Sequence, residues 1–150
     1  MNVRPGLAAA LALAPLLLPP ATPGGAPPAP GPGQPPQQQQ QVLRGEQVYA
    51  RCQGCHALVQ DRVGPHHCGL LGRRAGSVPG FAYSRAMKDS HITWDEKTLE
   101  QFLAAPLKAV PGTTMTYDGV PDAKDRADLI AYLRHANASA ACGQEGSGQR

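Results

Sequence analysis

Two cysteines and a histidine in the first half of the chain have the spacing of a cofactor attachment site. The stretch from Cys52 to His56 reads Cys-Gln-Gly-Cys-His, the C-x-x-C-H pattern that attaches c-type haem. In that chemistry the two thiols bind the porphyrin covalently and the histidine binds the iron. Residues three and four positions apart share one face of a helix, so Cys52, Cys55 and His56 can all face one ligand.

Two other kinds of site also use closely spaced cysteines. A redox dithiol of the thioredoxin type needs a strand before the motif, and no strand-like run precedes Cys52. A structural zinc site needs four ligands, and His67 and Cys68 are a candidate second pair. The motif alone leaves the zinc site open.

The elements that must position the motif are helices. Val48 and Tyr49 fall four and three residues before Cys52, which predicts an amphipathic helix with the motif at its C-terminal end. The spacing of Leu99 and its apolar neighbours predicts a second helix, and Asp122 is a candidate N-cap for the last one. No alternating run has the length of a strand, so the predicted fold class is all-α.

Composition divides the chain into four segments. Residues 1–26 combine the charge of Arg4 with an apolar run too short to cross a bilayer, which is typical of a signal peptide. If this leader is not cleaved, it would act as an N-terminal anchor. The Pro- and Gln-rich residues 27–41 are expected to form a disordered linker, 42–140 the globular domain, and 141–150 a flexible tail.

The charge pattern argues against nucleic-acid binding. The chain has 14 Lys and Arg against 11 Asp and Glu, a formal net charge of +3. It contains no run of like charge and one Arg-Arg pair, Arg73-Arg74. A small positive excess is compatible with docking to an acidic partner and equally with a merely soluble surface.

Seven short motifs then follow one another along the chain. They are Cys52-Gln-Gly-Cys-His56, Val63-Gly-Pro65, Gly69-Leu-Leu-Gly-Arg73, Gly80-Phe-Ala-Tyr-Ser84, Ile92-Thr-Trp94, Pro111-Gly-Thr-Thr-Met115 and Leu129-Ile-Ala-Tyr-Leu133. Through these motifs, residues 45–134 resemble class I cytochromes c, the mitochondrial-type proteins and their bacterial periplasmic relatives. The resemblance implies one small domain of about four to five helices wrapped around one covalently attached haem c.

The resemblance also implies roles for individual residues. Cys52 and Cys55 would hold the haem, and His56 and Met115 would be the two iron ligands. A thioether ligand is neutral and soft, so it would raise the reduction potential. The carbonyl of Pro65 would accept a hydrogen bond from the far ring nitrogen of His56 and fix the ring's orientation.

Three more residues resemble family residues that lie near the haem propionates. They are Arg73, Tyr83 and Trp94, whose guanidinium, phenol and indole N–H groups can donate hydrogen bonds to carboxylates. Met87 lies in a helix-like segment, and we interpret it as a core residue rather than a ligand.

The chain departs from the family's pattern at two places. His66 and His67 stand where relatives have a polar and then an apolar residue. We interpret His67 as a partly exposed histidine hydrogen-bonded in a loop, and an alternative iron ligand or a pH-sensitive element stays open. Thr114, Pro121 and Asp122 occupy positions of the docking face that are often basic in the family.

Two cysteines remain once the haem cysteines are assigned. An even pair in an exported protein favours a disulfide. Cys142 lies just past the last helix, which in the family packs across the first. Our hypothesis is a Cys68–Cys142 bridge that pins the tail.

The predicted function is that of a single-electron carrier, not an enzyme. The expected partners are redox proteins: a cytochrome complex or dehydrogenase as donor, and an oxidase or reductase as acceptor. The chain would be a periplasmic or otherwise exported monomer, without stable membrane insertion once the leader is removed. The alternative is a small haem enzyme or gas sensor with an open sixth iron position, for which Thr113, Thr114 and Thr116 offer poor acid–base groups.

Overall fold

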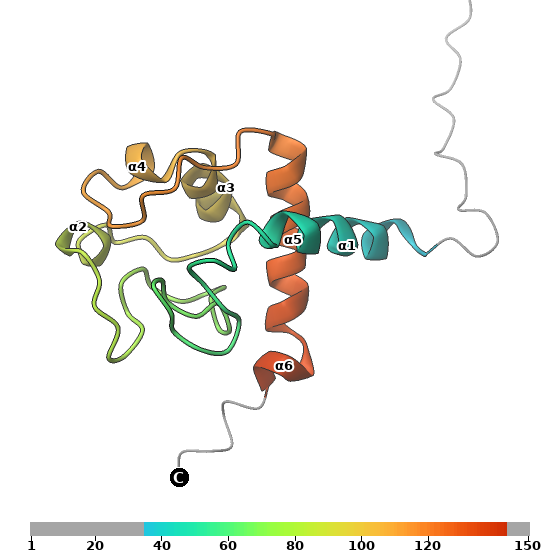
Figure 1. Ribbon diagram of the computed structural model, residues 1–150, viewed down its shortest axis with the longest axis horizontal. Coiled ribbons are helices and arrows are strands. Elements are labelled where there is room, and N and C mark those ends of the chain that lie inside the picture. The colour runs from blue at the N-terminus through green and yellow to red at the C-terminus, as the bar shows by residue number, and fades with distance from the viewer. Residues whose placement is uncertain (1–34, 144–150) are drawn as a thin grey trace, which may run out of the picture.

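The computed structural model describes residues 35–143, and this part of the chain is helical (Figure 1). Its helices are, in chain order, α1 (Gln37–Tyr49), α2 (Arg85–Lys88), α3 (Glu96–Ala104), α4 (Pro106–Ala109), α5 (Ala123–Asn137) and α6 (Ala140–Gly143). Between residues 35 and 143 there is no strand, and one isolated bridge pairs Arg74 with Thr93. The all-α prediction is confirmed. The helices outnumber the expected four to five because α2, α4 and α6 are short four-residue helices.

The first helix begins earlier than the sequence analysis predicted. Helix α1 starts directly after Pro36, so residues 37–41 are helical and do not belong to the linker predicted at 27–41. Glutamine has a high helix propensity because it loses little side-chain freedom there. The amide of Gln41 also donates to the carbonyl of Ala127 on α5 at 3.5 Å. Docking against α5 therefore extends the helix into the glutamine run.

The two ends of the predicted layout lie mostly outside the described residues. The signal peptide predicted at 1–26 is outside them, and so is most of the tail predicted at 141–150. The first residues of that tail, 141–143, belong to α6 instead. In the part of the chain that the structure describes, no helix combines the length and the apolar character needed to cross a membrane.

The crossing of α1 over α5 forms the frame of the domain (Figure 1). The two backbones come close because Gly45 of α1 has no side chain: a Cβ atom there would lie 1.9 Å from the carbonyl oxygen of Asp128. Beside this contact, the buried ring of Tyr49 packs on Tyr132 of α5, with ring centroids 5.0 Å apart. The end of α1, and the motif that follows it, are thereby fixed on α5.

A buried carboxylate strengthens the same crossing. The side chain of Asp128 is 4 % exposed and accepts hydrogen bonds from Arg44 of α1 at 2.7 Å and from Lys124 at 2.6 Å. Burial alone would raise the pKa of Asp128, but the hydrogen bonds and charges of the two cations outweigh it, so the pKa lies below its ordinary value.

We expect the domain to lose stability in acid as Asp128 takes up a proton. The folded-state pKa of Asp128 is lower than the unfolded one, so its contribution is present above an unfolded pKa of about 3.9 and is lost as the pH falls through the folded-state pKa. Asp128→Asn should lower the free energy of unfolding at pH 7 by about 2 kcal/mol, the usual size of a charged hydrogen bond. Urea unfolding at pH 7 and at pH 3 measures both effects.

The matched control for this prediction is Asp89→Asn. Asp89 forms an exposed pair with Arg85, in which both side chains are more than half exposed. Its substitution should leave the pH dependence almost unchanged. An Asp128→Asn protein with the same acid sensitivity as the unsubstituted one would show that Asp128 does not carry the effect.

Helix α3 begins at a complete capping box. The carboxylate of Asp95 accepts from the backbone N–H of Thr98 at 2.7 Å, and the hydroxyl of Thr98 accepts from the backbone N–H of Asp95 at 2.8 Å. The apolar face predicted for this helix is buried in the core. Pro106 then starts α4, where the missing N–H of proline costs nothing.

The connection between α1 and α2, residues 50–84, contains neither helix nor strand. Connections of this length without regular structure are uncommon in compact domains and are often functional. Asn137 near the end of α5 holds it twice: its side-chain oxygen accepts from the backbone N–H of Leu70 at 2.8 Å, and its amide nitrogen donates to the carbonyl of His67 at 3.1 Å. The connection is thus folded back onto the helices.

A disulfide ties this connection to the last helix. Cys68 and Cys142 are bonded, with 5.1 Å between their Cα atoms and 74 positions between them in the sequence. The hypothesis of a Cys68–Cys142 bridge is confirmed. The bridge also excludes the zinc site considered above, because Cys68 is not available as a thiolate ligand.

Removing this bridge is expected to lower the free energy of unfolding by up to about 4 kcal/mol, the chain-entropy value for a loop of this length. Cys142→Ser should therefore unfold at a clearly lower temperature and expose one titratable thiol in denaturant. Calorimetry and thiol titration check the two results. Two free thiols in the unsubstituted, haem-loaded protein would contradict the bridge.

Candidate haem-binding site

A cavity of about 300 Å³ lies between the 50–84 connection and the helices. The eight residues that the sequence analysis assigned to the site all line it: Cys52, Cys55, His56, Pro65, Arg73, Tyr83, Trp94 and Met115. Much of the remaining wall is apolar and includes Val63, Leu70, Phe81, Met87, Leu99, Phe102, Leu103, Leu129 and Leu133. A mainly apolar cavity with a few polar groups is typical of cofactor sites, which have volumes upward of about 300 Å³.

The C-x-x-C-H motif follows α1 directly rather than forming its last turn. Helix α1 ends at Tyr49, and residues 51–55 continue as consecutive turns. The backbone N–H of His56 still donates to the carbonyl of Cys52 at 2.9 Å, a helix-like bond that keeps the motif on one side. Cys52 is partly buried and Cys55 exposed, and neither takes part in the disulfide. Burial raises the pKa of the Cys52 thiol.

The ring of His56 is held in one orientation. Its Nδ1 lies 2.7 Å from the carbonyl oxygen of Pro65, and since a carbonyl only accepts, Nδ1 carries the proton and donates. Burial lowers the pKa of His56, and the Pro65 hydrogen bond opposes this in part. The neutral ring therefore leaves Nε2 unprotonated, as a metal ligand must be.

Gly64 leaves room for that ring. A Cβ atom at position 64 would lie 2.2 Å from Cε1 of His56 and 2.6 Å from each ring nitrogen, so no larger residue fits without moving the histidine. The glycine of the Val63-Gly-Pro65 motif thus serves the ring of His56 as well as the turn. The backbone around His56 therefore restricts the orientation of its ring, as is expected for a metal ligand.

Met115 reaches the same cavity from a different part of the chain. It lies on the loop after Pro111, where Gly112 adopts a positive φ of 89°. The backbone N–H of Met115 donates to the hydroxyl oxygen of Thr113 at 3.2 Å, and Thr113 itself is buried. The Met115 side chain is partly buried against the core cluster.

The three predicted propionate-side residues also line the cavity, each with its own partners. Arg73 donates to the carbonyls of Cys68 at 2.9 Å and His66 at 2.8 Å, which fixes the chain around the two histidines. Burial raises the pKa of Tyr83, against the lowering effect of Arg73. Trp94 is buried, with its ring centroid 5.0 Å from that of Phe102.

Two residues of the cavity wall were not assigned to the site from the sequence. The imidazole of His67 stacks on that of His56, with centroids 4.4 Å apart and 21° between the planes, and Tyr49 lies beside it. Burial lowers the pKa of His67 to about 3, and the electrostatic interactions of its ring with His56 and Arg73 act in the same direction. The signal in the sequence was the histidine at position 67, where the resemblance to class I cytochromes c implies an apolar residue.

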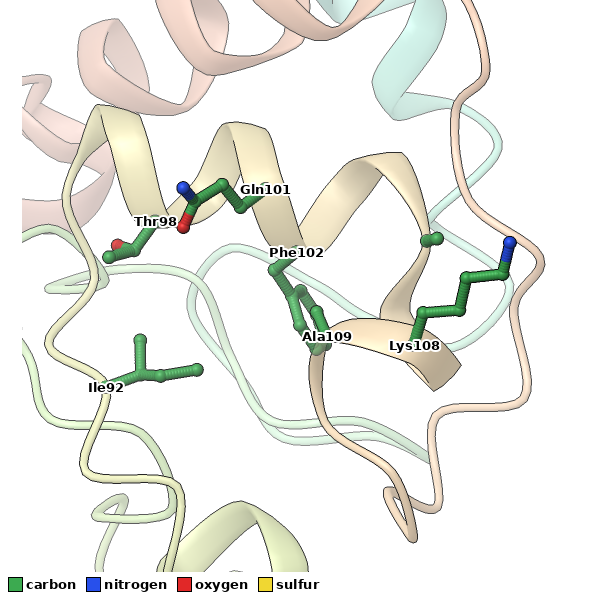
Figure 2. Close-up of a pocket in the computed structure, with 7 residues that line it drawn as sticks. Ile92, Thr98, Gln101, Phe102, Lys108 and Ala109 are labelled. Carbon is green, nitrogen blue, oxygen red and sulfur yellow. The ribbon is translucent and has the colours of Figure 1, made fainter.

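A second pocket, of about 350 Å³, lies on the surface between α3 and α4 (Figure 2). Figure 2 shows Ile92 on one side and Ala109 and Lys108 of α4 on the other. None of the predicted site residues lines this pocket, and Phe102 lines both it and the cavity that contains the predicted site residues. The pocket contains one charged side chain and no potential iron ligand, so it is not the functional site.

The residues present fit a covalently attached haem. One cavity is lined by two cysteines outside the disulfide, a histidine with an available Nε2, a methionine, and an apolar wall with a few hydrogen-bond donors. This donor set is that of a c-type haem with a histidine and a methionine on the iron.

Comparisons with known proteins agree with this chemistry. The family model "Cytochrome c" matches residues 42–137. The cytochrome c2 of Rhodomicrobium vannielii is 47% identical over 94 residues, which cover 61% of this chain and 75% of that protein. The cytochrome c of Tetrahymena pyriformis is 52% identical over 86 residues, covering 57% and 78%.

Among solved structures, cytochrome cH from Methylobacterium extorquens is similar, with a TM-score of 0.61 and 43% sequence identity. The match covers 63% of this chain and 97% of that one. The chain therefore belongs to the cytochrome c family and is an electron carrier with one covalently attached c-type haem.

Proposed function

We propose that Cys52 and Cys55 would form the thioether bonds to the haem and that His56 and Met115 would bind its iron, since all four residues line one cavity. The observation that carries this assignment is the hydrogen bond from Nδ1 of His56 to the carbonyl of Pro65, at 2.7 Å. It leaves Nε2 unprotonated on a ring that lines the same cavity as Met115.

The bound haem supplies a one-electron change at its iron, and the chain supplies binding, orientation and a dry surrounding. Pro65 and Gly64 fix the ring of His56, and the hydroxyl of Thr113 accepts a hydrogen bond from the backbone N–H of Met115. Occupation of both iron positions also leaves no site for a substrate, so the protein is proposed to transfer electrons without catalysing a reaction.

The physiological partners are proposed to be redox proteins that dock beside the cavity. Val63 lines the cavity and is 80 % exposed, so one apolar side chain of the cavity wall is available for contact with a partner. Arg51 lines the cavity as well, but it is paired with Asp125 at 3.1 Å. Thr114, Pro121 and Asp122 stand at positions that are often basic in the family, whereas Arg51, Lys88 and Lys108 remain. Docking is therefore proposed to combine a reduced positive charge with apolar contact. The donor is a cytochrome complex or dehydrogenase, and the acceptor an oxidase or reductase.

The protein is proposed to work outside the cytoplasm, in the periplasm or an equivalent exported compartment. The leader-like residues 1–26 support export. The Cys68–Cys142 disulfide supports it independently, because such bonds persist in oxidising compartments.

Covalent attachment through the first cysteine pair tests the assignment. We expect acidified acetone to leave the haem on the unsubstituted protein and to extract any haem from the Cys52→Ser, Cys55→Ser double variant. The matched control is the Cys68→Ser, Cys142→Ser double variant, which should keep its haem because those cysteines form the disulfide. Extraction from the unsubstituted protein, or loss of haem from the control alone, would refute the assignment.

A further inference from the structure

We propose that His67 is a positioning residue for the iron ligand His56: its imidazole, stacked on the face of His56, fixes the rotation of that ring and makes its surroundings more polar. The proposal rests on the function proposed above, in which His56 binds the haem iron. It goes further because it assigns a role to a residue that neither binds iron nor attaches the haem.

The stacking geometry is the first support. The two imidazole rings lie 4.4 Å apart between centroids and are within 21° of parallel, so one ring covers the face of the other. The hydrogen bond from Nδ1 of His56 to Pro65 acts in the plane of the His56 ring. A hydrogen bond at one nitrogen still permits the ring to tilt about that bond. A flat partner on the ring face removes this remaining freedom.

His67 can position the ring of His56 because its own side chain and backbone are hydrogen-bonded to neighbouring residues. Its Nδ1 lies 3.1 Å from the hydroxyl of Tyr49, which is buried and packs on α5. Its backbone N–H donates to the carbonyls of Ala57 and Leu58 at 3.0 and 3.1 Å.

The two ends of the His67 peptide are anchored as well. The carbonyl of His67 accepts from Asn137 at 3.1 Å, and the next residue, Cys68, is bonded to Cys142. Both anchors lead to the C-terminal helices α5 and α6. The rotation of the ligand ring is therefore coupled to the α1–α5 frame rather than to a loose loop.

A second imidazole next to the ligand also changes the polarity around the iron. An apolar shell disfavours the oxidised iron, which carries more charge, whereas a polar ring favours it. His67 lines the cavity together with His56, so its ring dipole acts at short range. An apolar residue at position 67 should therefore raise the midpoint potential.

Four proteins test the proposal: the unsubstituted holoprotein, His67→Leu, His67→Phe and the control His66→Leu. His66 is the adjacent histidine, but its ring is paired with Asp61. The measurements are the low-spin EPR g values of the oxidised protein, which report the orientation of the axial ligand ring, and the midpoint potential from redox titration.

We expect His67→Leu to change the g values, broaden the EPR signal and raise the midpoint potential. His67→Phe should keep the g values, because a flat ring remains stacked on His56, while His66→Leu should change neither quantity. The proposal is overturned if His67→Leu behaves as His66→Leu does, or if His67→Phe shifts the g values as much as His67→Leu.

The same series separates this proposal from the ligand assignment. The unsubstituted protein must show the low-spin spectrum and far-red sulfur-to-iron band of histidine–methionine ligation. If it does not, the ligand assignment fails whatever the His67 variants do. If it does and the His67 variants match the control, only the role of His67 fails.

Discussion

Replacing Met115 with leucine is expected to produce a protein whose reduced form binds carbon monoxide. Leucine nearly conserves the volume of methionine but cannot bind iron, so the sixth position opens with little repacking. The midpoint potential should fall by more than about 0.1 V, because axial ligands set haem potentials over a range of about 0.8 V. Absorption spectra with and without the gas, and a redox titration, measure the two effects.

The matched control is Met87→Leu. Met87 is the other methionine between residues 35 and 143, and it lines the same cavity but is buried in the core with 8 % exposure. Its substitution should cost some stability and leave the sixth position closed. Met115 would lose its assignment if Met115→Leu kept the sulfur-to-iron band, or if Met87→Leu were the variant that bound carbon monoxide.

Gly45→Ala is expected to lower the free energy of unfolding by more than about 3 kcal/mol, the upper part of the range for overpacking. The added Cβ would lie 1.9 Å from the carbonyl oxygen of Asp128 and 2.7 Å from Cβ of Tyr132. The first of these is a backbone atom, so relief requires α1 and α5 to separate. Alanine gains about 1 kcal/mol over glycine in helix propensity, which is too little to compensate.

Gly54→Ala is the control for this substitution. A Cβ atom at position 54 would have no atom within 4 Å beyond its chain neighbours, and Gly54 has no positive φ. Its stability should change by less than about 1 kcal/mol. Urea unfolding of both variants checks the comparison. A stabilised Gly45→Ala protein would mean that helix propensity governs the position and that α1 and α5 are not in close contact there.

The features of the site that depend on short fixed spacings could be predicted from the sequence. The motif from Cys52 to His56 defines the attachment chemistry by itself, and Pro65 follows closely enough for its carbonyl to be assigned to His56. Met115 needed the family resemblance, because a methionine on a loop has no local pattern that distinguishes a ligand from a core residue. The structure places all of these around one cavity.

Features that depend on contacts between distant segments could not be predicted. Arg44 and Asp128 are 84 positions apart, and no periodicity relates them. The stacking of His67 on His56 depends on how the irregular 50–84 connection folds back, which is determined by Asn137 and the disulfide. The start of α1, at Gln37 rather than after residue 41, also involves a contact with a distant segment, helix α5.

The glutamines before residue 42 show why helix ends are hard to predict. Composition alone makes a run of glutamine look like a linker, and its helicity depends on the docking of α1 against α5. Functional residues at short fixed spacings can be predicted from the sequence, whereas the packing between distant segments that positions them cannot.

Whether His56 and Met115 close both positions of a haem iron that exchanges single electrons can be measured in the absorption spectrum of the unsubstituted protein, oxidised and then reduced under carbon monoxide. We expect a weak far-red sulfur-to-iron band when the protein is oxidised. In the reduced protein we expect sharp low-spin bands that the gas does not shift. A high-spin spectrum that changes with carbon monoxide would contradict this expectation and indicate a haem with an open sixth position.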